Sequence, residues 1–164
     1  RTTNPADRVR AVDRLASWGG TALYDVILRS IGMLGRQTGR KSLVVFTDGE
    51  DEGSHATLAD VERALQSSDV TLYMIGQGRG VSKASLRAVM EQLSSPTGGR
   101  ALFTDSIDQL RGAFADLVDE LSTQYLLGYV PAGRRDNAWH RIGVTVDGQS
   151  NVRARQGYRI GEDR

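Results

Sequence analysis

The strongest constraint on the fold is a short apolar run, Leu43 to Phe46, that ends abruptly in the polar turn Thr47-Asp48-Gly49. Branched and aromatic residues favour a β-strand, and the lack of polar alternation predicts that both faces of the strand are buried. Strands of this kind belong to parallel sheets that helices cover on both sides. Ligands of open α/β sheets bind beyond the carboxyl ends of the strands, so Asp48 is the first residue to consider as functional.

Strand and helix patterns alternate along most of the chain. Two further apolar runs, 70–76 and 100–104, predict short buried strands. Apolar residues at helical spacing predict helices before, between and after the strands, over 21–34, 57–65, 82–93 and 106–121. This order predicts right-handed crossovers, and therefore an α/β fold: a Rossmann-like open parallel sheet flanked by helices.

Side-chain oxygens mark where several helices should begin. Asn4 precedes Pro5 in a pattern typical of a helix start. Thr57 is placed to cap the helix that follows it. Ser106 and Gln109 have the spacing of a capping box, in which each side chain accepts a backbone hydrogen bond at the helix start.

The pattern changes after Leu121. Residues 124–130 predict a strand, and 141–146 alternate as a half-buried strand does. Asp147-Gly148 is a strong hairpin turn signal, and 152–158 would form the last strand. We therefore expect a C-terminal antiparallel β extension over residues 123–164, joined to the parallel part over 1–122.

Composition narrows the classes of partner. With 164 residues there is room for one core, and a hydrophobic share of 39% is ordinary for a globular protein. The formal net charge of +1 predicts no strong field, so nucleic acid is not expected as a partner. The chain has no cysteine, which excludes disulfides and thiol chemistry. No apolar stretch reaches the ~20 residues of a membrane span.

The densest acidic group follows the first strand: Asp48, Glu50, Asp51 and Glu52. Hard cations such as Mg²⁺ prefer oxygen ligands, which a carboxylate at a strand end and the hydroxyl of Thr21 would both supply. Simpler interpretations stay open. Thr21 could act only as a helix cap, Asp25 could complement the helix dipole, and the acids after Asp48 could be solvated turn residues.

Other motifs are incomplete. Residues 35–42 have the wrong spacing and position for a phosphate-binding loop. Residues 76–80 follow a strand but lack the third glycine of a dinucleotide fingerprint, so both stretches are better interpreted as turns. His55 and His140 have no serine nucleophile context, which argues against a catalytic triad.

Four motifs together resemble a von Willebrand factor type A domain. They are Gly19 to Asp25, Leu43 to Asp51, Tyr73 to Gly78, and Thr97 to Arg100. Their order and approximate spacing both fit. The tail segments Gln124 to Pro131 and Val152 to Tyr158 are similar to the C-terminal extension of the bacterial branch often called VWFA-related.

The resemblance implies a protein-binding, non-enzymatic module with a metal-ion-dependent adhesion site. Thr21 and Asp48 would take the threonine and aspartate roles at a Mg²⁺ ion, with Mn²⁺ or Ca²⁺ as alternatives. Gly20, Gly49, Glu50 and Asp51 would form the rim of that site. A carboxylate of a partner protein would complete the coordination. The sequence itself gives no location, and the resemblance implies a secreted, periplasmic or cell-surface protein of a bacterium.

One departure from the family matters. No Asp-x-Ser-x-Ser loop follows any predicted strand, so we expect a truncated domain with weak or absent metal binding. The strand that ends at Thr47 would then have an unpaired edge, open to pairing with another chain. Two rivals to adhesion follow. One is a metal-dependent phosphoryl-transfer enzyme or hydrolase that uses Asp48, with Asp51 and His55 nearby. The other is a structural half-domain completed by another chain.

Overall fold

The computed structural model describes residues 4–7, 10, 20–78, 82–130 and 138–159. Pro5, Ala6 and Asp7 are helical. The named elements then follow in order: α2 (Leu23–Leu34), β1 (Lys41–Thr47), α3 (Leu58–Gln66), β2 (Val70–Gln77), α4 (Ala84–Ser94), the short 3₁₀ helix η2 (Ser95–Thr97), β3 (Ala101–Thr104), α5 (Ile107–Ser122), β4 (Trp139–Arg141) and β5 (Gly157–Arg159).

The first three strands form one parallel sheet in the order β1-β2-β3. Lys41 of β1 pairs with Val70 of β2, and Met74 of β2 pairs with Ala101 of β3. The expected α/β architecture is confirmed, with a helix between each pair of strands. Since all three strands are parallel, their carboxyl ends lie at one edge of the sheet, where β1 gives way to Asp48.

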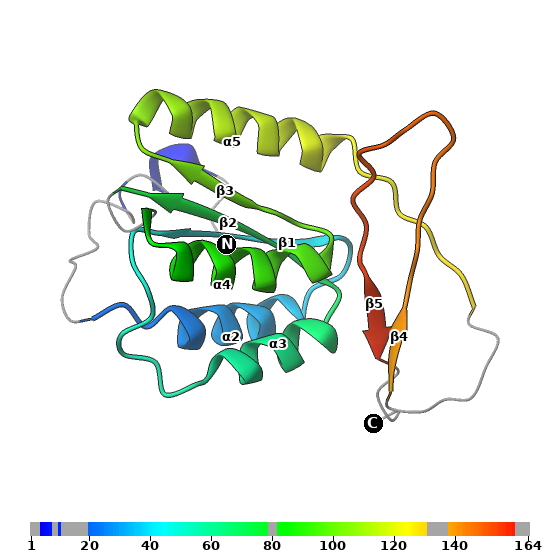
Figure 1. Ribbon diagram of the computed structural model, residues 1–164, viewed down its shortest axis with the longest axis horizontal. Coiled ribbons are helices and arrows are strands. Elements are labelled where there is room, and N and C mark those ends of the chain that lie inside the picture. Colours follow the sequence, from blue (N-terminus) through cyan, green and yellow to red (C-terminus); the bar gives the residue numbers. More distant parts are fainter. Residues whose placement is uncertain (1–3, 8–9, 11–19, 79–81, 131–137, 160–164) are drawn as a thin grey trace.

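Helices cover the sheet on both faces (Figure 1). The strand β2 is the centre of the core, because Leu72 and Met74 face one helical layer while Tyr73 and Ile75 face the other. The first layer is formed by α2, α3 and α4, and the second is α5, which contributes buried Leu117. This burial of both faces explains the unbroken apolar run from Leu72 to Ile75 in β2.

The strand β1 is less buried than its apolar run predicts. Val45 is buried, but Phe46 is 52% exposed and stacks on Phe114 of α5 with ring centroids 6.4 Å apart. Burial of both faces is thus wrong for Phe46. The physical reason is position: in the described part of the chain β1 pairs with β2 alone, so it is an edge strand.

Helix capping follows the sequence at some starts and departs from it at others. The Thr57 hydroxyl accepts a hydrogen bond from Asp60 N–H, and the Asp60 side chain accepts one from Thr57 N–H, which completes a capping box. Ser106 accepts from Gln109 N–H, but the Gln109 side chain accepts from Asp105 N–H rather than from Ser106. Asn4 Oδ1 accepts from Ala6 N–H, as expected for a cap.

The C-terminal extension is antiparallel, as expected, but its ladder is short. Trp139 pairs with Arg159 and Arg141 with Gly157, so the predicted strands over 141–146 and 152–158 are mostly irregular. Val146 bridges Gln149 across the predicted turn, where Gly148 has a positive φ of 75°. A strand over 124–130 is wrong for this structure, because these residues join no ladder and Tyr125, Leu126 and Val130 are more than four-fifths exposed.

This extension is attached to the amino ends of the parallel strands (Figure 1). Arg155 donates to the carbonyl oxygens of Leu65 and Val70, at 3.2 and 2.9 Å. Gln156 N–H donates to the Pro96 carbonyl oxygen at 3.0 Å. The extension therefore lies at the opposite end of the sheet from Asp48. The division of the chain at residue 122 stays a prediction. No described helix is long and apolar enough to cross a membrane.

Candidate functional site

Asp48 lies directly beyond the carboxyl end of β1. The Thr47 hydroxyl donates to the Gly49 carbonyl oxygen at 2.7 Å and accepts from Gly49 N–H at 3.3 Å, which closes a tight turn around Asp48. The residue is exposed. Among the described residues no hydrogen bond or ion pair engages its carboxylate. The turn therefore presents a carboxylate whose oxygens remain available to a ligand.

Thr21 lies beside the loop that follows Asp48. Its carbonyl oxygen accepts hydrogen bonds from Glu52 N–H at 2.8 Å and Gly53 N–H at 3.2 Å. The cap position of α2 is Ala22, and no side chain at that position makes a capping hydrogen bond. Thr21 is therefore not the N-cap, and within the described chain its hydroxyl has no hydrogen-bond partner. Thr21 and Asp48 therefore lie on two segments that backbone hydrogen bonds hold together.

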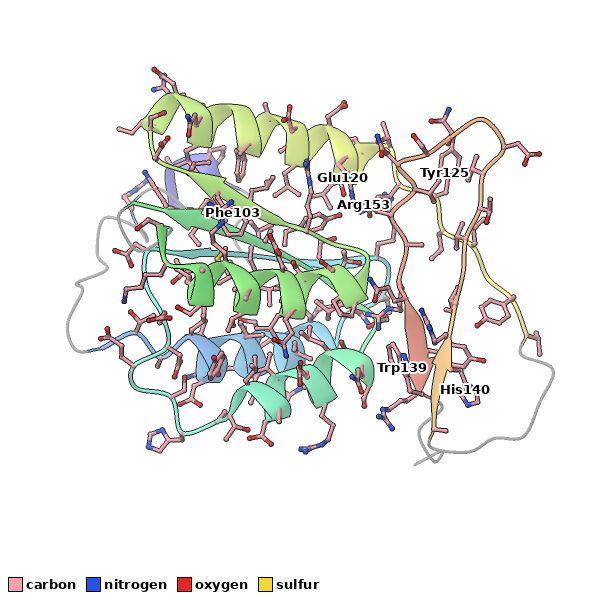
Figure 2. The ribbon with its side chains drawn as sticks, viewed as in Figure 1. Phe103, Glu120, Tyr125, Trp139, His140 and Arg153 are labelled. Atoms are coloured by element: carbon pink, nitrogen blue, oxygen red, sulfur yellow. The ribbon has the colours of Figure 1, made fainter. Side chains whose placement is uncertain are left out.

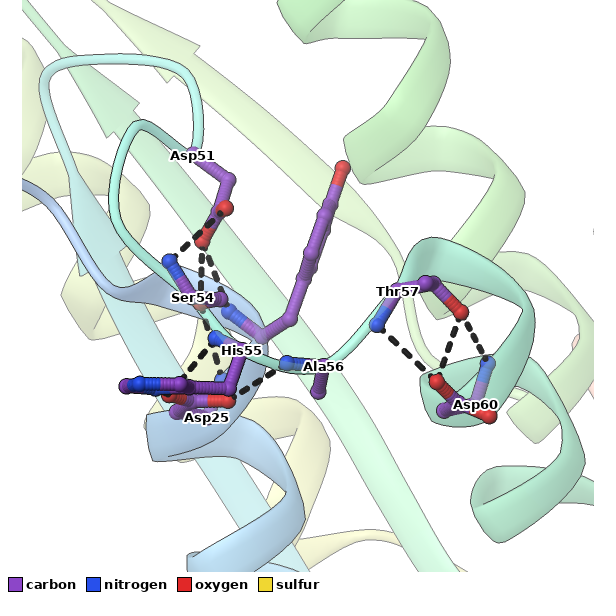
Figure 3. Close-up of polar contacts among 8 residues, drawn as sticks. Asp25, Asp51, Ser54, His55, Ala56, Thr57 and Asp60 are labelled. Carbon is purple, nitrogen blue, oxygen red and sulfur yellow. Dashed lines mark hydrogen bonds and ion pairs between the residues drawn. The ribbon is translucent and has the colours of Figure 1, made fainter.

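Asp51 points toward the start of α2 (Figure 3). Its Oδ1 atom accepts from Tyr24 N–H at 3.1 Å and from the Ser54 hydroxyl at 2.5 Å, and its Oδ2 accepts from Ser54 N–H at 3.3 Å. Both oxygens are therefore occupied by donors from the protein. Glu50 is also engaged: it accepts from Lys83 Nζ at 3.1 Å and from the Ser85 hydroxyl. These two donors, the hydroxyl first, lower the pKa of Glu50.

Asp25 makes the reverse connection, from α2 to the loop (Figure 3). It accepts from His55 N–H at 3.0 Å and Ala56 N–H at 2.9 Å, and His55 Nδ1 lies 3.2 Å from Oδ2. The two backbone hydrogen bonds are the main reason that the pKa of Asp25 is lowered. The sequence indicated only that Asp25 complements the helix dipole. No local signal in the sequence gives this role, because the two N–H donors lie 30 and 31 residues further along the chain.

The rim glycines differ in their surroundings. A Cβ on Gly49 would meet no atom within 4 Å, whereas one on Gly20 would lie 3.5 Å from Glu52 Cβ. Gly20 therefore lies against the loop and Gly49 does not. The stretch 76–80, which the sequence predicts to be a turn, lies partly outside the described residues.

The donors present suit a hard cation but supply only part of its coordination. In the part of the chain that the structure describes, no group of three or more His, Cys, Asp or Glu side chains is placed to hold a metal. The Asp48 carboxylate and the Thr21 hydroxyl, like the Glu52 carboxylate, make no hydrogen bond or ion pair with the described residues, and their oxygens are of the type that Mg²⁺ prefers. Mg²⁺ usually keeps several waters, so a site with few protein ligands is chemically reasonable.

Of three comparisons with known proteins, one identifies the family of this chain. The family described as "von Willebrand factor type A domain" matches residues 6–117. A search of curated proteins finds no match. Among solved structures, an uncharacterized membrane spanning protein from Vibrio fischeri is similar at 15% identity and a TM-score of 0.43, over 71% of this chain and 66% of that chain. The family match covers well over half of the sequence, and the chain therefore belongs to the von Willebrand factor type A domain family.

Proposed function

We propose that this chain is a non-enzymatic protein-binding module that contacts its partner at the carboxyl edge of the β1-β2-β3 sheet. Thr21 and Asp48 would hold a Mg²⁺ ion there. One observation supports this proposal above others: in the described chain these two side chains are unengaged, while the neighbouring Asp25, Glu50 and Asp51 are all satisfied internally. Many domains of this family mediate protein interactions, which agrees with the proposal.

Each part of the site has a distinct task. The Thr47–Gly49 turn fixes the direction of Asp48, and the hydrogen bonds to the Thr21 carbonyl oxygen keep the two segments together. When bound, Mg²⁺ would present an electropositive coordination position to a partner carboxylate. The rival hydrolase is less well supported, because Asp51 is occupied by α2 and Ser54, and the His55 ring pairs with Asp25.

Calorimetric titration with Mg²⁺ and Mn²⁺ tests the ion site. We expect binding by the chain and its loss in Asp48→Ala, with weakened binding in Thr21→Val, which keeps the shape of the side chain. Asp108→Ala, on the exposed first turn of α5, is the matched control and should bind as the parent does. A folded chain that binds neither ion, or an Asp48→Ala variant that binds both normally, would contradict the proposal.

A second measurement tests access by a carboxylate. Acetate serves as the probe, and the relaxation rate of its methyl protons is measured with Mn²⁺ bound to the chain. Enhanced relaxation that disappears in Asp48→Ala would show that the ion accepts an outside carboxylate. Bound Mn²⁺ with no enhancement would mean that the ion position is closed, which argues against adhesion through a partner carboxylate.

The free side of β1 favours a second candidate function, assembly of two copies through this strand. Within the described residues β1 pairs with β2 alone, and Phe46 at its end is 52% exposed. Edge strands of this kind pair readily with other chains. Sedimentation at increasing concentration should then show a dimer that Phe46→Lys disrupts and Asp48→Ala leaves intact. A chain that stays monomeric would exclude this candidate.

A further inference from the structure

The loop between β1 and α3 and the start of α2 exchange carboxylates. Asp51, from the loop, accepts from Tyr24 N–H of α2, and Asp25, from α2, accepts from His55 and Ala56 N–H of the loop. Ser54 joins the two halves, because its hydroxyl donates to Asp51 and accepts from Asp25 N–H at 3.1 Å. We call Asp25, Asp51 and Ser54 the carboxylate clasp.

The clasp supplies the hydrogen-bond acceptors that the start of α2 lacks. The first N–H groups of a helix have no intrahelical acceptors, and Ala22 at the cap position offers none. Asp51 and Ser54 accept from Tyr24 and Asp25 N–H instead. The helix therefore takes its cap from a loop 27 to 29 residues further along the chain, and helix and loop stabilise one another.

We infer that the clasp positions the candidate ion site: Asp25 and Asp51 act as positioning residues that hold the Asp48 loop against Thr21. Glu52 and Gly53, whose N–H groups donate to the Thr21 carbonyl oxygen, lie in sequence between Asp51 and His55, the residue that Asp25 contacts. The contacts of the two carboxylates therefore lie on either side of these hydrogen bonds. The effect of the clasp on ion binding rests on the proposed function. The effect of the clasp on the position of the loop is independent of that function.

The contacts argue against Asp51 as a ligand in its own right. Three donors converge on its two oxygens, so this carboxylate has much less capacity left for an ion than Asp48 has. Displacement of the Tyr24 N–H would leave α2 with an unsatisfied N–H group. Asp48, in contrast, has no such donors within the described chain. The contacts thus distinguish Asp48, whose carboxylate is available to an ion, from Asp51, whose carboxylate supports the loop.

Amide hydrogen exchange tests the clasp without any ion. In Asp51→Asn and Asp25→Asn we expect the Glu52 and Gly53 amides, which touch neither carboxylate, to exchange about tenfold faster or more, because their local opening is no longer restrained. Asp108→Asn is the control. If only the Tyr24 or His55 amides accelerate while Glu52 and Gly53 keep the parent rate, the carboxylates merely satisfy their own donors and the inference is wrong.

Mn²⁺ affinity tests the consequence. Supporting residues of metal sites typically contribute about 10-fold to 100-fold in affinity, so Asp51→Asn should weaken Mn²⁺ binding by that factor while remaining folded. Unchanged affinity in a chain that binds Mn²⁺ would overturn the positioning role. If the parent chain binds no Mn²⁺, the proposed function fails, and the exchange rates still decide whether the clasp exists. Ser54→Ala, a milder change, replaces Asp51→Asn if that variant does not fold.

Discussion

Glu120 Oε2 lies 2.6 Å from Arg153 Nη2, and this ion pair joins α5 to the C-terminal extension (Figure 2). The other Glu120 oxygen accepts from the Tyr73 hydroxyl at 3.1 Å, and Gln124 Nε2 donates to the same hydroxyl at 2.7 Å. The Glu120 side chain is only 16% exposed. A single carboxylate therefore connects the central strand, the last long helix and the extension.

Glu120→Ala should destabilise the protein by about 1–3 kcal/mol, because it leaves the buried Tyr73 hydroxyl and the Arg153 guanidinium without their acceptor. Urea unfolding gives the free energy, and Trp139 fluorescence reports on the extension. Asp119→Ala, the neighbouring exposed acid on α5, should change the free energy of unfolding little. A Glu120→Ala variant as stable as Asp119→Ala would mean that this network contributes nothing.

An alkaline titration should show that Tyr73 ionises at unusually high pH. Burial first, and Glu120 second, raise the pKa of Tyr73 to about 12, so the folded state favours the neutral phenol. Unfolded tyrosine titrates near pH ~10, and the stabilisation is therefore full below that value and is lost as pH rises toward about 12. In a phenolate absorbance titration the last tyrosine to ionise should be missing from Tyr73→Phe. An unchanged titration curve would refute the assignment.

Two glycine substitutions should act in opposite directions. A Cβ on Gly99 would collide with the Leu72 carbonyl oxygen in the backbone of β2, so Gly99→Ala should cost about 1–3 kcal/mol. Gly112, inside α5, has open space around it, and Gly112→Ala should stabilise the protein by about 0.5–1 kcal/mol. Thermal and urea unfolding measure the change in the free energy of unfolding of both variants. A tolerated Gly99→Ala would show that β2 and the start of β3 can separate at little cost.

The capping box of α3 should contribute to acid sensitivity. Hydrogen bonds from the Thr57 hydroxyl and then from Thr57 N–H lower the pKa of Asp60 in the folded state. A lowered carboxyl pKa gives stability that is present above the unfolded value of ~3.9 and is lost as pH falls through the folded value. Asp60→Asn should therefore show a shallower loss of stability in acid. Thr57→Ala should cost about 1 kcal/mol at neutral pH through loss of the cap.

The strands and helices of the parallel core could be predicted because the pattern of each lies within its own stretch of sequence. Apolar runs such as Val70–Ile75 and helical stripes such as Val61 and Leu65 identify each element without its neighbours. The other features depend on which elements lie beside each other in the fold. Whether Phe46 is covered depends on which strand lies beside β1, and whether 124–130 forms a strand depends on a ladder partner. Neither is encoded in the run itself.

The candidate site could be predicted in part for the same reason. Asp48 follows a strand and Thr21 precedes a helix, so each could be placed at the carboxyl edge from its own surroundings. The carboxylate clasp could not, because Tyr24 and Asp51 are separated by 27 residues and no local rule pairs them. Local rules assigned Asp25 to the helix dipole and the acids after Asp48 to solvent. Asp25 and Asp51 instead each accept backbone N–H groups of the opposite segment, and Glu50 accepts from the side chains of Lys83 and Ser85.

The attachment of the extension through Arg155 has a practical consequence for display and measurement. A carrier or sensor surface joined to this extension would hold the chain by the amino ends of its strands. Thr21 and Asp48 would then face outward into solution, unobstructed by the support. Many copies coupled in this orientation would form a multivalent surface on which a weakly binding partner could be retained by avidity.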